Sequence, residues 1–322
     1  MKLAILDDYQ NAALGAADWS SLPGHPGDMA IRTFDTHLGH DENRIAETLA
    51  PFDIIVAMRE RTPFPASLIA RLPNLKLLVT TGMRNLAIDM AAARERGIDV
   101  CGTSVPAYPA AEHAMALILE LFKKISSENA AMHAGKWQTV VAEGLSGKTL
   151  GLLGLGRLGD RVARFGKALD MDVIAWSQNM TPERAAEAGA THVARDELFA
   201  RSDVLSIHLV LSDRTRGLVG ARELDLMKPT AYLVNTSRGP IVDEKALIET
   251  LTAKRIAGAG IDVFDVEPLP RDHPLRKLDN AVLTGHTGYV VKEFFRIGYG
   301  EAVEDIAAWM AGKPIRLLNP AG

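Results

Sequence analysis

The 322-residue chain is 47% hydrophobic and 24% charged, which suits one large or two medium globular domains. Its net charge of −4, with lysine and arginine spread along the chain, does not favour nucleic acid or an acidic membrane as a partner. The single cysteine, Cys101, excludes an internal disulfide framework. The N-terminus lacks a signal-peptide core and no apolar run is long enough to span a membrane, so we expect a cytoplasmic protein.

The first hundred residues alternate between short strand-like runs and helical stretches. Strands are expected at residues 3–6, 31–34, 53–57, 75–80 and 98–100, and helices at 41–49, 65–71 and 86–96. This alternation predicts a parallel sheet covered by helices. Because the stretch contains no G-x-G-x-x-G, we do not expect it to hold a dinucleotide.

A long amphipathic helix is expected next, over residues 110–134, as a connector between two domains. A second series of strands and helices follows over residues 144–290, and a last helix over 290–310. Residues 314–319 are expected to return to the first domain. The predicted fold is therefore α/β, with two doubly wound parallel sheets. A dinucleotide-binding domain of residues 101–290 is inserted into a domain made of residues 1–100 and 291–322.

The most specific motif opens the second series. Residues 149–176 are expected to form a strand, a G-x-G-x-x-G loop, a helix and a second strand, which together make a βαβ unit. The first glycine permits the tight turn, the second lets the backbone approach a pyrophosphate, and the third lets the helix pack on the strand. The helix N-terminus offers N–H groups to the phosphates. The predicted cofactor-binding residues of this loop are Gly154, Gly156, Arg157, Leu158 and Gly159.

The end of the second strand of this unit lacks the acidic residue that binds the ribose 2′-hydroxyl in NAD-preferring sites. Ser177, Gln178 and Asn179 stand there instead, and each can hydrogen-bond a hydroxyl or a phosphate. Without the carboxylate nothing repels a 2′-phosphate, although no arginine follows before Arg184. The sequence predicts NAD or NADP as cofactor, with a slight preference for NADP.

Three residues beyond later strands could carry chemistry: Arg238, Glu267 and His286. Ligands of open α/β sheets bind beyond the carboxyl ends of the strands, so we expect these side chains to share a cleft with the dinucleotide. A histidine can protonate a carbonyl oxygen, and a nearby carboxylate would raise its pKa. A guanidinium binds a substrate carboxylate with a planar fork. The set suits hydride transfer from NAD(P)H to a 2-keto acid.

The chain resembles the D-isomer-specific 2-hydroxyacid dehydrogenases over essentially its whole length. The matching motifs are GLGRLG at 154–159, VNTSRGPIVDE at 234–244, GAGIDVFDVEP at 258–268 and GHTGY at 285–289. Their order and spacing match those of the family. The resemblance implies a Rossmann NAD(P)-binding domain inserted into a flavodoxin-like substrate-binding domain, and a homodimer whose interface includes the helix over 110–134.

The resemblance also implies roles for individual residues. Arg238 would orient the substrate, and Glu267 with His286 would form the acid/base pair. Further cofactor contacts would be His208, Thr236 and Asp262, the last of these at the nicotinamide end. No metal site is expected, because the histidines show no metal-ligand spacing.

The first domain resembles the family's substrate lid. Residues 58–64 and 77–89 occupy the positions of two loops that face the cleft, and the substrate carboxylate would meet backbone N–H groups around Gly82, Met83 and Arg84. Arg59 and Arg61 match arginines of the family's phosphoglycerate dehydrogenases, although a solvated surface role suits them equally.

Several departures from the family pattern leave the substrate open. Residues 83–89 replace a usual Gly-x-Asp-Asn-Ile-Asp run, Gly285 replaces the proline before the catalytic histidine, and residues 208–211 replace His-x-Pro-Leu. The first hypothesis is a glyoxylate or hydroxypyruvate reductase. Alternatives are a 3-phosphoglycerate dehydrogenase, although no regulatory module is expected after residue 322, and a dinucleotide-sensing protein like the family's co-repressors.

Overall fold

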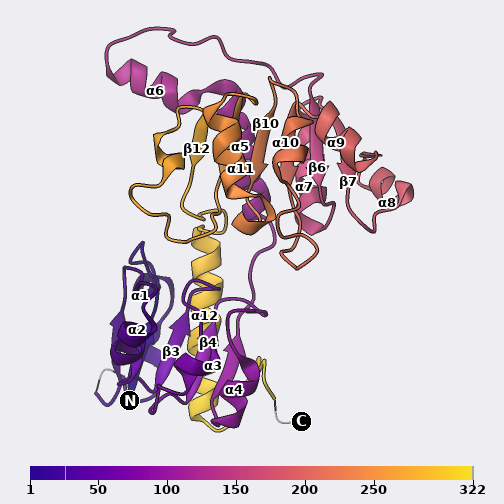
Figure 1. Ribbon diagram of the computed structural model, residues 1–322. Coiled ribbons are helices and arrows are strands. Elements are labelled where there is room, and N and C mark those ends of the chain that lie inside the picture. Colours follow the sequence, from indigo (N-terminus) through magenta and orange to yellow (C-terminus); the bar gives the residue numbers. More distant parts are fainter. Residues whose placement is uncertain (26, 321–322) are drawn as a thin grey trace. The chain divides into compact units, whose positions relative to one another are not determined.

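The computed structural model describes residues 1–25 and 27–320 (Figure 1). It contains two compact units, each with its own parallel sheet. The first is made of Met1–Pro106 and the chain from Val290 onward, and the second of Ala107–Tyr289, so one unit is inserted into the other. In the part of the chain described here, no helix is both long and apolar enough to cross a bilayer.

The first unit is built on five parallel strands in the order β2-β1-β3-β4-β5, which is the 2-1-3-4-5 order of flavodoxin-like folds. Its strands are β1 (Lys2–Ile5), β2 (Ala30–Thr33), β3 (Ile54–Ala57), β4 (Leu77–Thr80) and β5 (Asp99–Gly102). Its helices are α1 (Ala13–Ala16), α2 (Glu42–Leu49), α3 (Ala66–Ile69), α4 (Met90–Glu95) and α12 (Lys292–Met310), with a 3-10 turn, η1, at Trp19–Ser21.

Helices cover both faces of this sheet, which explains why β3 and β4 are buried throughout and apolar except for Thr80. The helices α2, α3 and α4 contribute to one hydrophobic cluster with alternate residues of β1, β3 and β4. On the other face, α12 (yellow in Figure 1) packs against β4 and α1. The chain after α12 returns to the edge strand β5, where Leu317 bridges Cys101 and the Asn319 side chain accepts from the Val100 N–H at 2.8 Å.

The second unit has seven parallel strands in the order β12-β11-β10-β9-β6-β7-β8. This is the Rossmann order with one strand added at an edge, and the order reverses between β6 and β9. The strands are β6 (Thr149–Leu153), β7 (Asp172–Trp176), β8 (Thr191–His192), β9 (Val204–Ile207), β10 (Tyr232–Asn235), β11 (Gly258–Ile261) and β12 (Ala281–Leu283).

Two layers of helices enclose the second sheet, and each layer has its own hydrophobic cluster. One layer contains α5 (Pro109–Lys123), α7 (Arg157–Ala168) and α8 (Pro182–Glu187). The other contains α9 (Arg195–Arg201), α10 (Ala221–Asp225) and α11 (Glu244–Thr252), while the 3-10 turns η2 (Gly239–Ile241) and η3 (Pro274–Lys277) lie in the connections. Because both faces are covered, the polar loops that follow the strands gather at the carboxyl edge of the sheet.

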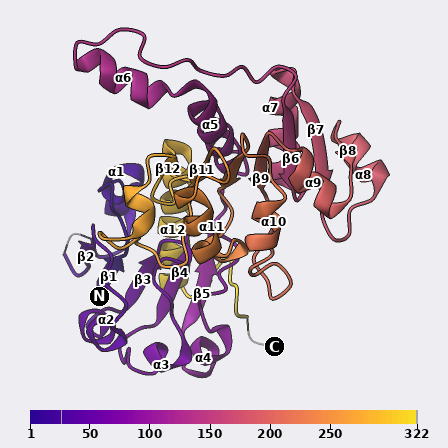
Figure 2. The same ribbon diagram turned by 45° about the horizontal axis from the view of Figure 1, so that its top comes forward.

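The prediction of a single helix over residues 110–134 is wrong, because the chain forms two helices there, α5 and α6 (Ile125–His133). The break is at Lys124, which adopts a left-handed conformation with φ of +53°. Glu120 then accepts hydrogen bonds from the Ser126 N–H and so caps the start of α6. The periodicity missed the break because α5 is anchored by its buried apolar face, whereas α6 buries no residue and runs away from the sheet of its unit (Figure 2).

Candidate functional site

The glycine loop between β6 and α7 has a backbone that suits a pyrophosphate. Gly154 has φ of +102°, and a Cβ there would lie 2.8 Å from the carbonyl oxygen of His208. A Cβ at Gly159 would overlap the Gly154 carbonyl, so α7 packs against the loop only because that position is glycine. At Gly156, the N-cap of α7, a Cβ would meet no atom of the described chain within 4 Å. This open position lies next to the first N–H groups of α7, contributed by Arg157 and Leu158, and fits a dinucleotide phosphate.

The end of β7 lies directly beside the glycine loop, because the Gly154 N–H donates to the Trp176 carbonyl at 2.9 Å. Ser177 follows and is half-buried, and its carbonyl accepts from Met180 in a tight turn. Within that turn Gln178 and Asn179 are exposed. The structure therefore brings the three polar residues at this strand end close to the glycine loop.

His208 follows β9, on the other side of the switch point from the end of β7. Its Nε2 lies 2.9 Å from the Ser206 hydroxyl. Burial lowers the pKa of His208 to about 4, so the ring is neutral near pH 7. His208 therefore offers a neutral imidazole rather than a cation, and its backbone carbonyl lies next to Gly154.

The loop after β10 carries Arg238 and is tied to the sheet by its own polar side chains. The Asn235 amide donates to the Arg238 carbonyl at 3.0 Å and accepts from the Ser237 N–H, also at 3.0 Å. The Ser237 hydroxyl donates to the carbonyl of Ile207 in the neighbouring strand β9 at 2.8 Å. Thr236 lies in the same loop and is half-buried. These bonds fix the backbone from which the Arg238 side chain extends.

Gly239 brings the Arg238 loop into direct contact with the loop that carries Glu267. A Cβ at Gly239 would overlap the Phe264 carbonyl group and lie 2.7 Å from the nitrogen of Asp265. These are backbone atoms, so a side chain could be accommodated only if the two loops moved apart. The spacing between the arginine loop and the glutamate loop therefore depends on this glycine.

Glu267 and His286, two of the predicted catalytic residues, are in direct contact. The Nδ1 of His286 lies 2.7 Å from Oε2 of Glu267, while Oε1 of Glu267 accepts from the Phe264 N–H at 3.0 Å. Their side chains are 18% and 23% exposed, so the pair is sheltered but reachable. His286 has φ of +53°, and its N–H donates to the Thr284 carbonyl. With Nδ1 directed at the carboxylate, Nε2 is on the opposite side of the ring.

Asp262 is buried beneath the His286 loop, and its carboxylate holds that loop in place. Oδ1 accepts from the Thr284 hydroxyl at 2.6 Å and the Thr287 N–H at 2.7 Å, and Oδ2 accepts from the Gly288 N–H at 2.9 Å. On α5, His113 directs its Nε2 at the Thr284 hydroxyl at 2.9 Å and at Asp262 at 3.3 Å. Burial alone would raise the pKa of Asp262, but the hydrogen bonds involving His113 and Thr284 lower it.

The predicted substrate residues of the first unit form their own cluster, at the carboxyl ends of β3 and β4. The Arg59 N–H donates to the Thr81 hydroxyl at 3.0 Å, and its guanidinium to the Thr81 carbonyl at 3.4 Å. A Cβ at Gly82, which has φ of +143°, would lie 2.5 Å from Nη1 of Arg59. Met83 and Arg84 are exposed. The backbone of this loop is thus held against Arg59.

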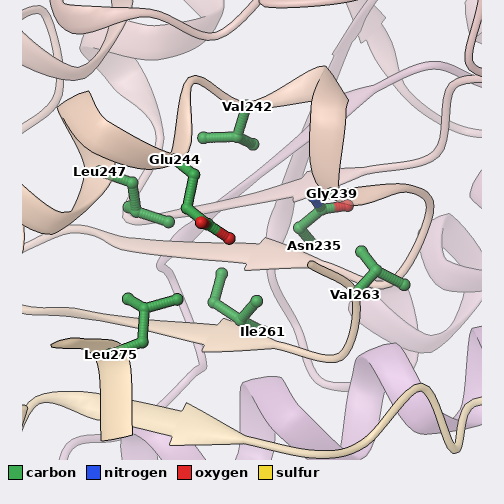
Figure 3. A pocket seen from close by; sticks show the side chains of 8 residues that line it. All are labelled: Asn235, Gly239, Val242, Glu244, Leu247, Ile261, Val263 and Leu275. Carbon is green, nitrogen blue, oxygen red and sulfur yellow. The ribbon is translucent and has the colours of Figure 1, made fainter. Parts of the chain in front are cut away.

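A small cavity lies beside the Arg238 loop, and Glu244 is the only charged residue that lines it (Figure 3). The other lining residues are Asn235, Gly239, Val242, Leu247, Ile261, Val263 and Leu275. Glu244 lies 3.1 Å from the Nε2 of His273 and accepts from the Asp265 N–H at 3.4 Å. Glu244 therefore helps to hold the loop that leads to Glu267. Across the described residues, no three His, Cys, Asp or Glu side chains gather in a way that could hold a metal ion.

Residues 115–288, more than half of the chain, match the family model of the D-isomer specific 2-hydroxyacid dehydrogenase NAD binding domain. The chain belongs to this family. A glyoxylate reductase from Aeropyrum pernix is 38% identical to it over 78% of each chain. A phosphoglycerate oxidoreductase structure from Vibrio cholerae has a TM-score of 0.90 and 37% identity, over 97% of this chain and 99% of that one. A D-3-phosphoglycerate dehydrogenase from Archaeoglobus fulgidus is 37% identical over 86% of this chain, which spans about half (53%) of that relative.

Sequence reasoning missed one residue of this 2-hydroxyacid dehydrogenase site, His113, which contacts Thr284 and Asp262. It stands within α5, far along the chain from the motifs, and no spacing rule connects it to them. Its position becomes evident only when α5 packs against the second sheet. Asp262, in contrast, was singled out from its motif, and the structure adds its hydrogen bonds to the His286 loop.

Gly239→Ala should lower turnover by about 10- to 100-fold, because the new methyl group must separate the Arg238 and Glu267 loops and small displacements of reacting groups are costly. Dinucleotide affinity should fall much less than turnover, because the glycine loop is a different segment. Steady-state kinetics and a dinucleotide titration measure the two effects. Gly144→Ala, at a position with open space around it, is the matched control. Unchanged turnover in Gly239→Ala would show that loop spacing is unimportant.

His113→Leu should reduce kcat by about tenfold and lower Tm, because the Thr284 hydroxyl and the Asp262 carboxylate lose a half-buried donor. His113→Gln keeps an N–H donor and should preserve most of the activity. The comparison is made from kcat, KM and thermal unfolding of both variants. Equal loss in the two variants would mean that the hydrogen bond has no part in positioning the His286 loop.

Proposed function

We propose that the protein reduces a small 2-keto acid to a D-2-hydroxy acid and catalyses the reverse oxidation, with NAD or NADP as cofactor. The observation that carries the proposal is the 2.7 Å contact between His286 Nδ1 and Glu267 Oε2, in the same unit as the glycine loop. The Arg238 loop is packed against the Glu267 loop through Gly239. A proton donor, a carboxylate partner and a guanidinium thus come from neighbouring loops of one sheet edge.

Each residue of this set has a distinct chemical task in the proposal. When bound, the nicotinamide supplies or accepts the hydride. His286 donates a proton from Nε2 to the carbonyl oxygen of the keto acid and takes it back in the oxidation. Glu267 fixes the ring through Nδ1 and favours the protonated imidazole before the transfer. Arg238 binds the substrate carboxylate with its planar fork and polarises the adjacent carbonyl.

Cofactor and substrate contacts are proposed for the remaining site residues. The glycine loop with His208 and Thr236 would hold the dinucleotide, and Asp262 would contact its nicotinamide end. In the first unit, backbone N–H groups of residues 82–84 would bind the substrate carboxylate. The Ser177 strand end carries no acid, which supports use of NADP alongside NAD.

The proposed substrates are glyoxylate, hydroxypyruvate or a related small keto acid, in line with the name of the Aeropyrum relative. A second candidate is 3-phosphoglycerate, because Arg59 and Arg61 begin the loop after β3 and because the Archaeoglobus relative carries that name. A phosphorylated substrate would need cations of this kind. The two candidates differ in charge, so direct assays separate them.

A homodimer is also proposed, with α6 and the segment after it in the interface. The helix α6 buries no residue, and Ile125, Met132, Trp137 and Val141 are 59%, 49%, 74% and 101% exposed. In Figures 1 and 2 this stretch extends away from the sheet of its own unit. Several exposed large apolar side chains in one segment are typical of a protein interface.

A panel of keto acids, together with D-3-phosphoglycerate in the oxidative direction, should be assayed with NADH or NADPH and the corresponding oxidised forms. We expect turnover of a small keto acid by the wild type and a loss of about 100-fold or more in Arg238→Gln, because the substrate carboxylate loses its charged clamp. Arg271→Gln, at an exposed arginine beyond Glu267, is the control. Wild-type-like turnover in Arg238→Gln would remove this role, and dinucleotide binding without any turnover would favour the sensing alternative.

The double variant Trp137→Ser/Val141→Ser should weaken the dimer by about 100-fold or more, because burying each large apolar side chain contributes roughly 1.5–3 kcal/mol. Light scattering coupled to size exclusion measures the mass as a function of concentration. The control, Leu14→Ser, changes a residue of α1 that is 55% exposed. A monomeric wild type, or a double variant that dimerises as well as the wild type, would argue against this interface.

A further inference from the structure

The short helix α8 brings a cation to the glycine loop. The Arg184 guanidinium donates from Nη2 to the carbonyl oxygen of Leu155 at 3.5 Å. Leu155 stands between Gly154 and Gly156, the two glycines that open the loop. The end of β7 contacts the same loop through the bond from Gly154 to Trp176. Arg184 and Ser177 therefore both lie next to the first turn of the dinucleotide-binding loop.

The chain between Ser177 and Arg184 is shaped so that the arginine returns to this loop. A tight turn, closed by the Met180 N–H and the Ser177 carbonyl at 3.1 Å, reverses the chain after β7. Thr181 then caps α8, since its hydroxyl accepts from the Arg184 N–H at 3.3 Å, and Pro182 occupies the first helical turn. The position of Arg184 is thus set by local structure, although it stands some way beyond the strand end.

The Arg184 guanidinium also has two acidic neighbours. Its Nη2 lies 3.7 Å from Oδ1 of Asp160, and its Nη1 3.3 Å from Oε2 of Glu187. The Arg184 side chain is 42% exposed, and ion pairs with this degree of exposure are weak and exchange readily. Arginine has five N–H donors, so it can keep its bond to Leu155 and still bind a phosphate.

We propose that Arg184, with the Ser177 hydroxyl, binds the 2′-phosphate of NADP. NAD-preferring sites use an acid at the end of this strand to bind the 2′-hydroxyl, and such an acid would repel a phosphate. Here the strand end is uncharged and a guanidinium stands beside the same loop. The inference rests on the proposed function in that it assumes a dinucleotide cofactor. It adds that the Arg184 guanidinium is the group that distinguishes NADP from NAD.

The pyrophosphate and the 2′-phosphate are thereby assigned to different arginines. Arg157 is exposed at the start of α7, next to the loop N–H groups that would bind the pyrophosphate common to both dinucleotides. Arg184 instead contacts the loop at the carbonyl of Leu155, between its first two glycines. Loss of Arg184 should therefore affect ligands that carry a 2′-phosphate more than ligands that lack it.

The test is a calorimetric comparison of 2′,5′-ADP with 5′-ADP, which needs neither the nicotinamide nor a substrate. The wild type should bind 2′,5′-ADP more tightly. Arg184→Gln should weaken 2′,5′-ADP binding by about 10- to 100-fold, the usual range for one charge-assisted hydrogen bond, and leave 5′-ADP binding nearly as before. Ser177→Asp should also weaken 2′,5′-ADP binding more than 5′-ADP binding, because the new carboxylate repels the 2′-phosphate. Arg164→Gln is the matched control, because Arg164 also pairs with Asp160, at 3.2 Å, from an exposed position on α7.

Two results would overturn the assignment: a wild type that binds both nucleotides equally, or an Arg184→Gln variant that loses both equally. The second would mean that Arg184 supports the loop rather than the phosphate. Keto-acid turnover without any preference for 2′,5′-ADP would refute the Arg184 role alone. A preference that disappears in Arg184→Gln, in a protein that turns over no keto acid, would support the Arg184 role and refute the proposed reaction.

Discussion

The buried carboxylate of Asp262 organises the loop that carries His286. A charge with 1% exposure is tolerated only when its oxygens are hydrogen-bonded, and here the donors include two backbone N–H groups and one hydroxyl of the loop itself, besides His113. Removing the loop from this position would take away most of these donors. The need to satisfy a buried anion therefore fixes the backbone around His286, which sits in a left-handed conformation that the rest of the loop must support.

A second constraint sets the distance between the other two loops, and it is steric rather than electrostatic. Gly239 lets the backbone after β10 touch the backbone after β11, so Arg238 and Glu267 start from adjacent positions. The Glu267 carboxylate then uses one oxygen for its own loop, at Phe264, and the other for His286. The contact at Gly239 and the two hydrogen bonds of Glu267 therefore connect three loops at one sheet edge. Any chemistry at that edge depends on these contacts.

The extent to which this arrangement follows from sequence depends on the range of the interactions involved. The glycine loop, its strand and the strand ends could be predicted because hydrophobic periodicity and glycine chemistry act locally, and Arg238, Glu267 and His286 follow those ends. The break at Lys124 could not, because it depends on where packing against the sheet stops. His113 was missed for a similar reason: its partners directly follow β11 and β12, which only the folded sheet places beside α5.

The proposed cofactor contacts fall into two groups, the glycine loop and the segment after β7. This division affects how the choice between NAD and NADP can change. The glycine loop would bind what all dinucleotides share, and two of its glycines, Gly154 and Gly159, are constrained by contacts with each other and with His208. The turn after β7 and most of the helix α8 are exposed, and α8 is held by a threonine cap, a proline and one buried residue, Ala185. Substitutions there can alter the charge next to the loop without disturbing the loop. Compared with a Rossmann site that carries an acid at this strand end, the chain therefore differs in one local segment, from Ser177 to Arg184. The framework around that segment need not differ.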